Sequence, residues 1–243
     1  MSHLIDSGAE YIKVLDGLDL MSGLNGWSRQ RTGWAWTRLD WDKRFGADHQ
    51  VDILTVKRLE DLERDGRFDL LCASPPCETF STGSIGKHWT GGKRAYVAGS
   101  DAAKRGLKIL AHTFALIDSY RDRHPRTLYI LENPRCLTHI FTPRPPTTEQ
   151  WWCHWGERVA KPSHLWTNIL IDWPEPCHNN RDHLPTCCCA DHDPQSRYHA
   201  KRKALGQTGG TQGKKDAAAR AVIPERLATT VMLYAEAFAA SII

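Results

Sequence analysis

One cysteine of this chain, Cys77, directly follows two prolines, and it is the strongest candidate for a nucleophile. The apolar run from Phe68 to Ala73 is typical of a short buried strand, and the two prolines must end it because proline fixes φ and donates no backbone hydrogen bond. Cys77 is then presented at the carboxyl end of the strand, where open α/β sheets gather their reacting groups. A thiol on a rigid turn suits nucleophilic attack, although most cysteines are only small buried apolar residues.

A carboxylate follows a second apolar run in the same way. The segment Thr127–Leu131 has the pattern of a buried strand, and Glu132, Asn133 and Pro134 follow it. Because proline disfavours a helical conformation in the residue before it, we expect Glu132 and Asn133 on an extended turn at the carboxyl end of this strand. A carboxylate beside buried apolar residues is costly unless it has a partner or a function, so we predict a functional role for it.

A glycine-bearing turn near the start of the chain has the pattern of a cofactor site. The turn, residues 22–26, follows the apolar residues Leu18–Met21, and a helix can begin at Trp27. A strand, a glycine turn and a helix in this order form the local plan of a nucleotide-type site, because glycines let the backbone approach a ligand. A plain connection between a strand and a helix is the alternative interpretation.

Two acidic residues continue this pattern. The alternating segment Trp34–Leu39 predicts a second strand that ends at Asp40, about 20 residues after the glycine turn, where a ribose hydroxyl pair is usually bound. The neighbouring Trp41 can stack on an adenine ring. A third short strand is expected at Gln50–Leu54, which contains Asp52.

The order of the predicted elements gives the fold class. Strands and helices, including a helix at Asp101–Arg121, alternate through residue 134, which predicts an α/β protein with a mostly parallel, Rossmann-like sheet and helices on both faces. From about Pro143 prolines and tryptophans replace this alternation, and a final helix begins at Pro224. We therefore expect a main domain of residues 1–142 and 220–243 and a small, irregular Cys/His-rich lobe of residues 143–219.

Composition narrows the class of protein. The chain has 243 residues, a net charge of +4, and 41% hydrophobic and 25% charged residues, which is ordinary for a soluble globular protein. It has no apolar run long enough for a transmembrane helix and no secretion signal, so a cytoplasmic location is expected. Its eight cysteines then indicate reduced thiols used for catalysis or metal binding.

Three motifs in this order resemble the DNA (cytosine-5) methyltransferase family, in a compact form like those of phage genomes. The motifs are residues 19–28 around the glycine turn, residues 74–81 with Pro-Pro-Cys, and Glu132-Asn133-Pro134. The resemblance covers roughly residues 12–135 and continues more weakly to the last helix. It implies a methylase that uses S-adenosylmethionine in the cytoplasm of a bacterial or phage-infected cell.

The resemblance also assigns roles to individual residues. Cys77 would attack carbon 6 of cytosine, Glu132 would assist at ring nitrogen 3 with a raised pKa, and Asn133 would order the cysteine turn. The target base would be flipped out of double-stranded DNA, and the glycine-rich segment after Cys77 would close over it. The implied S-adenosylmethionine-binding residues are Asp19, Met21, Ser22, Gly23, Asn25, Gly26, Asp40, Trp41, Asp52, Ile53 and Pro76.

The chain departs from the family in two places. Asn25 replaces the first glycine of the usual Gly-Gly pair, and the turn can survive because asparagine tolerates positive φ better than most residues. The later Gln-x-Arg-x-Arg motif of the family has no clean counterpart. Lys161 and His164 are its nearest matches and are assigned to the catalytic site, with Arg158 as the less favoured substitute.

The predicted lobe contains enough cysteines and histidines for a zinc site. We select Cys177, Cys187, Cys189 and His192 as its ligands, although their spacing is not that of a standard zinc finger. A surface loop with reduced thiols is the alternative. The lobe also carries a basic run, from Arg197 to Lys203, that could contact phosphates or remain a solvated loop.

Three functions remain open at this point. The first is a cytosine-5 methyltransferase acting on double-stranded DNA, with a monomer favoured. The second is a DNA-binding relative without catalysis, against which the intact Cys77, Glu132 and Asn133 argue. The third keeps the chemistry but acts on RNA or a free cytosine nucleotide. Amino-group methylases are disfavoured because they place an aromatic residue after Pro-Pro, where this chain has a cysteine.

Overall fold

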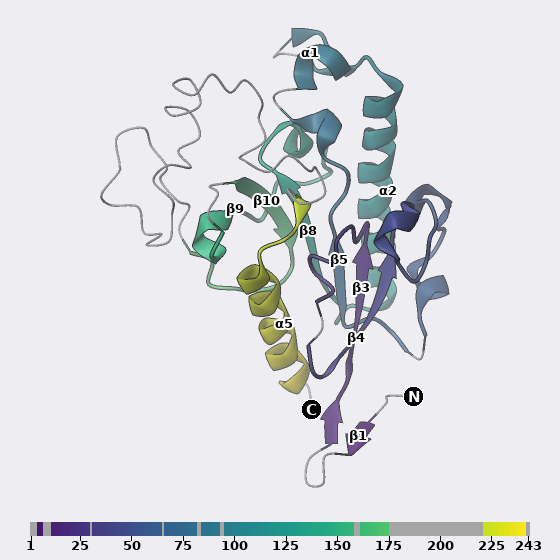
Figure 1. Cartoon of the computed structure of the whole chain (residues 1–243), viewed down its shortest axis with the longest axis vertical. Helices are drawn as coiled ribbons and strands as arrows, with labels where there is room; N and C mark the ends of the chain where they lie inside the picture. Colours follow the sequence, from purple (N-terminus) through teal and green to yellow (C-terminus); the bar gives the residue numbers. More distant parts are fainter. Residues whose placement is uncertain are drawn as a thin grey trace, which may run out of the picture.

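A six-stranded mixed sheet forms the centre of the protein. The computed structural model describes residues 4–6, 11–29, 31–64, 66–81, 84–92, 95–157, 161–174 and 221–241. The strands lie in the order β4-β3-β5-β8-β10-β9 (Figure 1). Their bounds are β3 Leu15–Leu20, β4 Trp34–Leu39, β5 Leu70–Ala73, β8 Leu128–Pro134, β9 Thr148–Trp151 and β10 Pro162–Thr167. The first four are parallel, and β10 pairs antiparallel with both β8 and β9, so the predicted α/β class and mostly parallel sheet are confirmed.

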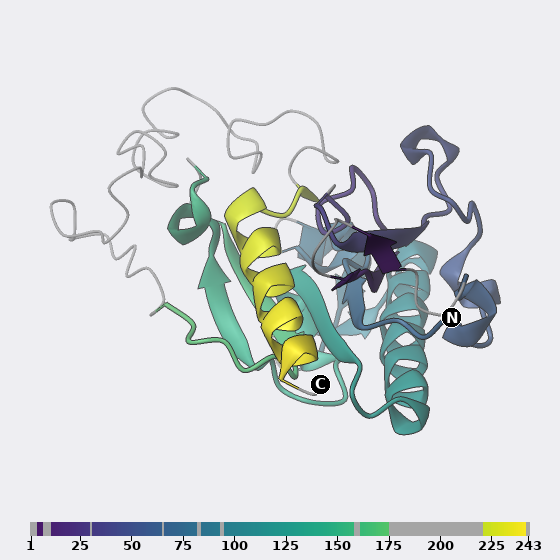
Figure 2. The same cartoon turned by 90° about the horizontal axis from the view of Figure 1, so that it is seen from below.

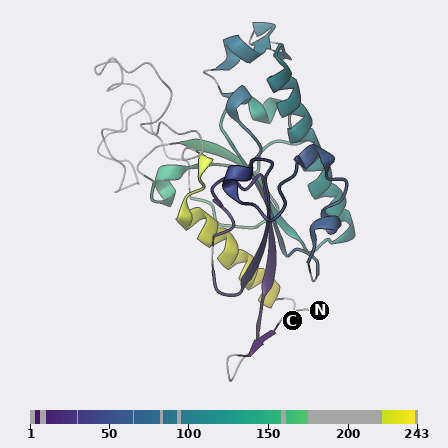
Figure 3. The same ribbon diagram turned by 45° about the vertical axis from the view of Figure 1, so that its right-hand side comes forward.

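Two helices cover the two faces of this sheet. Helix α2, Asp101–Arg123, lies on one side of the strands, and helix α5, Glu225–Ala240, lies on the other (Figures 2 and 3). Alternation along each strand supplies both cores. In β5, for example, Leu71 and Ala73 join the apolar cluster that contains α2, whereas Leu70 and Cys72 join the cluster that contains α5.

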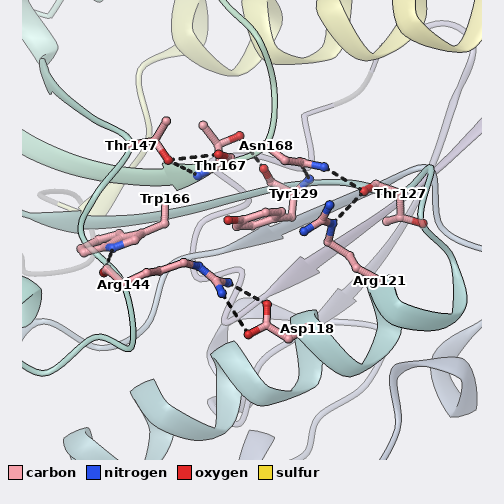
Figure 4. A network of polar contacts seen from close by, with 9 residues as sticks. All are labelled: Asp118, Arg121, Thr127, Tyr129, Arg144, Thr147, Trp166, Thr167 and Asn168. Atoms are coloured by element: carbon pink, nitrogen blue, oxygen red, sulfur yellow. Dashed lines mark hydrogen bonds and ion pairs between the residues drawn. The ribbon is translucent and has the colours of Figure 1, made fainter.

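Specific polar contacts cap the start of helix α2 and hold the helix against the sheet. The Ser100 hydroxyl caps its first turn by accepting a hydrogen bond from the Ala103 N–H at 3.1 Å. Near its other end Asp118 pairs with the guanidinium of Arg144 at 2.7 and 3.0 Å (Figure 4). Arg144 also lies over the rings of Phe114 and Tyr129, and this network therefore joins the segment before β9 to the helix and the sheet.

Helix α5 and the residues before it pack against the segment that follows the glycine turn. The expected helix at Trp27 is wrong, because residues 27–29 are irregular. Instead Trp27 is buried in the same cluster as Ile223 and Leu227, and Arg29 donates to the Ile223 carbonyl at 2.8 Å. A Cβ atom on Gly26 would lie 2.8 Å from the Ile223 backbone nitrogen, so only glycine allows this approach.

Short elements account for most other differences from expectation. The third strand expected at residues 50–54 is wrong, since residues Ile53–Thr55 form a 3-10 helix capped by the Asp52 carboxylate. A second 3-10 helix spans Leu59–Leu62. A separate hairpin of β1, Leu4–Asp6, and β2, Tyr11–Lys13, precedes the sheet.

The chain after Cys77 forms more regular structure than a glycine-rich loop would suggest. Helix α1, Ile85–His88, leads into a two-stranded hairpin of β6, Trp89–Thr90, and β7, Val97–Ala98, beside the start of α2 (Figure 1). The rings of Trp89 and Phe141 stack with their centroids 4.7 Å apart. This small substructure is thereby packed against the segment that follows β8.

The expected lobe of residues 143–219 is described only up to residue 174. Its described part contributes β9 and β10 to the main sheet, and residues 175–219 lie outside the described residues.

Among the helices that the structure describes, none has the length and apolar character needed to cross a membrane.

Candidate functional site

The glycine turn and the cysteine turn lie side by side at the carboxyl ends of β3 and β5. The Trp27 indole N–H donates to the Ser74 hydroxyl at 3.1 Å, and the Ser74 N–H donates to the Leu20 carbonyl at 3.2 Å. Adjacent parallel strands bring their carboxyl ends to the same edge, which is where ligands bind in open α/β sheets. Two motifs about 50 residues apart in the sequence therefore form one site.

Cys77 is half-buried and begins a short 3-10 helix, Glu78–Phe80. Loss of solvation raises the pKa of its thiol to about 11. The positive charge of Lys161 acts in the opposite direction, and the charges of Glu132 and Glu78 raise the pKa further. The structure therefore brings three of the predicted catalytic residues, Cys77, Glu132 and Lys161, close enough to interact electrostatically.

Glu132 lies inside strand β8, and the prediction of a turn at this position is wrong. The strand continues to Pro134 because β10 pairs with it, with Leu165 opposite Glu132 and Ser163 opposite Pro134. The Glu132 side chain is 3% exposed. Its Oε1 atom accepts a hydrogen bond from the Ser163 hydroxyl at 2.5 Å and lies 3.6 Å from the Lys161 ammonium.

Asn133 links this strand to the cysteine turn. Its amide Nδ2 donates to the Pro75 carbonyl at 2.8 Å, and its Oδ1 accepts from the Thr138 hydroxyl at 2.6 Å. Both Asn133 and Thr138 are buried, so the orientation of the amide is fixed from both ends. This geometry agrees with the expectation that Asn133 orders the turn that carries Cys77.

His164 points to the other face of the sheet from Glu132. Strand alternation places it beside Trp166, whose ring lies in the α2 cluster, and 5.1 Å from the ring of His139. Burial lowers the pKa of His164, and the neighbouring His139 lowers it further, although Glu149 opposes this at 3.5 Å. Of the two predicted matches to the missing arginine motif, the structure thus brings only Lys161 to the Glu132 side chain.

The glycine turn itself contains unusual backbone and unusual polar atoms. Met21 and Asn25 both have φ near 57°, and Gly23 has φ near 51°, so the predicted tolerance of Asn25 for positive φ is used. Asp19 is 1% exposed and accepts from the Ser28 N–H and hydroxyl at 3.0 and 2.7 Å. Despite these bonds, burial raises the pKa of Asp19 to about 7.

Three polar atoms at this turn are buried and have no hydrogen-bond partner among the described residues. They are Asp19 Oδ1, Ser22 Oγ and Asn25 Oδ1. Buried polar groups without partners are rare in folded proteins, and one ordinary explanation is that a ligand supplies the partner. The donor and acceptor atoms present here therefore fit a polar cofactor at the turn.

The other predicted cofactor residues have varied surroundings. Asp40 is buried and accepts from the N–H groups of Gly23 and Asp42, both at 2.9 Å, so it also stabilises the turn. Trp41 is 66% exposed next to it. Gly26 contacts Ile223, as described above.

Asp52 is half-buried and has a cationic partner. Burial acts to raise the pKa of Asp52, but hydrogen bonds from Arg105, at 2.6 Å, and from the Leu54 N–H outweigh it and lower the pKa. The next residue, Ile53, is buried in the α2 cluster, and Pro76 is half-buried on the cysteine turn.

The predicted zinc ligands Cys177, Cys187, Cys189 and His192 lie outside the described residues, so the zinc site stays a prediction. Within the described residues, no group of three or more histidine, cysteine or acidic side chains could hold a metal ion.

A cavity of about 730 Å³ lies elsewhere, beside β4. Its lining includes Trp34, Trp36 and three arginines, of which Arg38 and Arg64 pair with Asp48. It does not include Cys77, Glu132 or the residues of the glycine turn except for the adjoining Ser28, so we do not assign it to the candidate site.

Sequence signals could have found part of what was missed. Ser163 was not selected, although it shares a face of its strand with Leu165 and therefore had to lie on the opposite face from the neighbouring His164. Trp152 was not selected either, and the Lys161 ammonium lies 3.4 Å from the centre of its ring.

Comparison with known proteins gives one relative over most of the chain. No protein-family model matches. The chain is 27% identical over 205 residues to a Frog virus 3 protein named "Probable DNA (cytosine-5)-methyltransferase", and the match covers 82% of this chain and 88% of the viral protein.

Two solved structures overlap with part of the fold. One is a candidate DNA modification methyltransferase encoded within an E. coli prophage, with 14% identity and a TM-score of 0.44, covering 63% of this chain and 46% of that one. The other is a methyltransferase of Entamoeba histolytica, with 15% identity and a TM-score of 0.40, covering 66% and 55%. Because this chain spans only about half of each, the fold assignment rests on the sheet topology described above.

Proposed function

We propose that this chain transfers a methyl group from S-adenosylmethionine to carbon 5 of cytosine in DNA. The resemblance of the sequence to the DNA (cytosine-5) methyltransferase family is confirmed by its viral relative. One observation carries the proposal. The Cys77 thiol interacts electrostatically with the buried Glu132 on β8, and the turn that carries Cys77 is bonded through Ser74 to Trp27 at the end of a glycine turn that has three buried polar atoms without partners among the described residues. A nucleophile, a carboxyl group and a cofactor site are therefore combined at one edge of the sheet.

Cys77 supplies the nucleophile in this proposal. Carbon 5 of cytosine is too weak a nucleophile to accept a methyl group unaided. The Cys77 sulfur forms a bond to carbon 6, and the electron pair of the 5,6 double bond becomes available at carbon 5. After carbon 5 has gained the methyl group it loses its proton to water, the double bond re-forms, and the sulfur leaves.

Lys161 counteracts the burial that keeps the Cys77 thiol protonated in the resting protein. Its ammonium is buried between Glu132 and the ring of Trp152, and its charge lowers the pKa of the thiol. The thiol proton passes to a water molecule that reaches the half-buried Cys77. Lys161 thus favours the thiolate that the attack requires.

Glu132 acts on the ring of the same base. A hydrogen bond or proton from its carboxyl group to ring nitrogen 3 draws electrons away from carbon 6 and makes that atom easier to attack. Asn133 holds the cysteine turn against the same strand through the Pro75 carbonyl, so the two reacting side chains keep a fixed separation.

S-adenosylmethionine supplies an electrophilic methyl group when it is bound. The residues that would hold it are the glycine turn, with its unpartnered Asp19, Ser22 and Asn25 atoms, and Asp40, whose bond from the Gly23 N–H keeps that turn in place. Asp52 and Ile53 have roles in the fold as well, as a helix cap and a core residue, which their assignment to the cofactor does not exclude.

DNA is the proposed substrate, and its target base must leave the duplex to reach Cys77. The decisive experiment incubates the protein and S-adenosylmethionine with duplex DNA that contains 5-fluorocytosine, because fluorine at carbon 5 cannot leave as a proton does and so traps the covalent adduct. We expect a slower band on a denaturing gel, absent for Cys77→Ala. Salt-sensitive DNA binding without an adduct would instead support the noncatalytic reader, and an adduct with RNA alone would change the substrate.

A further inference from the structure

Ser163 makes a short hydrogen bond with the proposed catalytic carboxyl group. The Ser163 side chain is fully buried, and its hydroxyl donates to Glu132 Oε1 at 2.5 Å. Hydrogen bonds between a hydroxyl and a carboxylate are typically this short, and they are stronger than those between neutral groups. Ser163 comes from β10, a different strand, so the bond joins the two strands at the site.

The position of Ser163 follows from the register of the two strands. Leu165 lies opposite Glu132 in the antiparallel pair, and Ser163 lies opposite Pro134, two residues away on the same face. A side chain at this diagonal position is within reach of its neighbour on the adjoining strand. Leucine at 165 packs into the α5 cluster, whereas the hydroxyl at 163 is directed to the carboxyl group.

Both described polar contacts of the Glu132 carboxyl group fall on the same oxygen. Oε1 accepts from Ser163 and lies 3.6 Å from the Lys161 ammonium. A protonated carboxyl group carries its proton on one oxygen and only accepts on the other. Donors at Oε1 leave Oε2 as the oxygen that can carry a proton when the carboxyl group takes one up.

We propose that Ser163 is a positioning residue that selects Oε2 of Glu132 as the atom that meets ring nitrogen 3 of the base. This inference rests on the function proposed above. The hydroxyl fixes the rotation of the carboxyl group and keeps Oε1 as the acceptor, so the transferable proton faces the substrate. No bond to Ser163 is made or broken in the reaction.

Lys161 cannot provide this selection by itself. Its distance of 3.6 Å from Oε1 is that of an ion pair, longer than a directional hydrogen bond, and its ammonium is also engaged with the ring of Trp152. A point charge on a flexible stem attracts the carboxyl group without fixing its rotation. The short bond from Ser163 is therefore the contact that defines which oxygen faces the base.

The test compares Ser163→Ala with a control on the same strand. Thr167 is also buried on β10, and its hydroxyl donates to the Tyr129 carbonyl of β8 at 2.5 Å, away from the site. Thr167→Val removes an equivalent strand-to-strand bond without touching Glu132. For Ser163→Ala we expect kcat for DNA methylation to fall roughly 10- to 100-fold, the loss typical of one hydrogen bond to a charged group.

Three readouts separate positioning from simple loosening of the strand. The KM values for DNA and S-adenosylmethionine should stay within about two-fold of wild type, since binding is not the step affected. Ser163→Thr, which keeps the hydroxyl, should recover most of the lost kcat. Ser163→Cys preserves the shape with a weak donor and should remain impaired, which covers the case in which Ser163→Ala does not fold.

Each contrary result has its own meaning. An unchanged kcat in folded Ser163→Ala, or an equal loss of kcat in Thr167→Val, would overturn the positioning role while leaving the proposed function intact. A wild-type protein that neither methylates DNA nor forms the fluorocytosine adduct would overturn the proposed function first, and the role of Ser163 with it.

Discussion

The buried carboxyl group of Asp19 predicts a specific dependence of stability on pH. Its pKa rises from 3.8 to about 7, mainly because burial disfavours the charged form, and the bonds from Ser28 only partly offset this. A group whose pKa is raised on folding stabilises the protein fully below its unfolded pKa. This contribution is lost as the pH rises through the folded pKa. Asp19→Asn removes the titration while keeping an acceptor oxygen for Ser28.

The size of the effect follows from the two pKa values. Since one pKa unit corresponds to about 1.36 kcal/mol, the interval from 3.8 to about 7 corresponds to about 4 kcal/mol over the full pH range. Between pH 5 and pH 8 the change is about 2.5 kcal/mol. The wild-type protein should therefore lose about that much free energy of unfolding relative to Asp19→Asn over these three pH units.

Urea unfolding of both proteins at several pH values from 5 to 8 measures this difference directly. Other titrating groups contribute equally to both proteins and cancel. The amide of Asp19→Asn can shift the free energy of unfolding by a constant amount, but this does not matter, because only the change of that free energy with pH is compared. Ser28→Ala serves as a control, because it removes a bond that lowers the pKa of Asp19 and should extend the decline to higher pH. Parallel stability curves for wild type and Asp19→Asn would refute the reasoning.

Two further predictions follow from contacts in the structure. A Cβ atom at Gly17 would lie 2.5 Å from the ring of Trp36, so Gly17→Ala should lower the free energy of unfolding by about 1–3 kcal/mol. Adding Trp36→Leu to Gly17→Ala should recover most of the lost free energy of unfolding. If urea unfolding shows that the losses of the two single variants simply add in the double variant, the predicted clash is contradicted. Because the pKa of Cys77 is about 11, its alkylation by iodoacetamide, followed by peptide mass spectrometry, should rise about tenfold per pH unit from 8 to 10. Lys161→Met should slow it further, and a rate that levels off below pH 9 would show a lower pKa.

Local sequence patterns predicted the parallel strands of the sheet, β3, β4, β5 and β8, well. The alternation at Trp34–Leu39 corresponds to β4 without any shift, and the apolar spacing of Asp101–Arg121 corresponds to α2 with two more residues. In both segments the spacing of apolar residues matches one type of element. Each also has a clear boundary, which is a carboxylate after the strand and a capped start before the helix. The glycine turn and the cysteine turn then fell at the carboxyl ends of β3 and β5, because parallel strands share one edge.

The errors came from contacts between distant parts of the chain. Nothing local shows that residues 27–29 are irregular, because Trp27 packs against the distant Ile223 and Leu227. Similarly, β8 extends through Glu132 and Asn133 only because β10 pairs with it. The short polar side chain of Asp52 caps a 3-10 helix. An alternating pattern of only five residues cannot distinguish such a capped turn from a strand.

The candidate site was predictable by residue type but not by orientation. Cys77, Glu132 and Asn133 could be selected as candidates from the apolar runs before them and the prolines beside them. Which side chain of the strand at 162–167 faces Glu132 depends on the strand register, and Ser163 rather than His164 occupies that face. A one-residue difference reverses the face of every side chain, so motif matching alone could not decide between them.

The covering of one face of the sheet by α5 has a consequence for how this chain folds as it is made. Arg29 and Arg31 bond to Ile223 and Glu236, partners 194 and 205 positions away along the chain. During synthesis the apolar face around Leu70 and Leu128 therefore stays open until helix α5 has left the ribosome. Such distant contacts slow folding and leave a nascent chain prone to aggregate, so this protein should depend on chaperones more than a domain whose core is completed early.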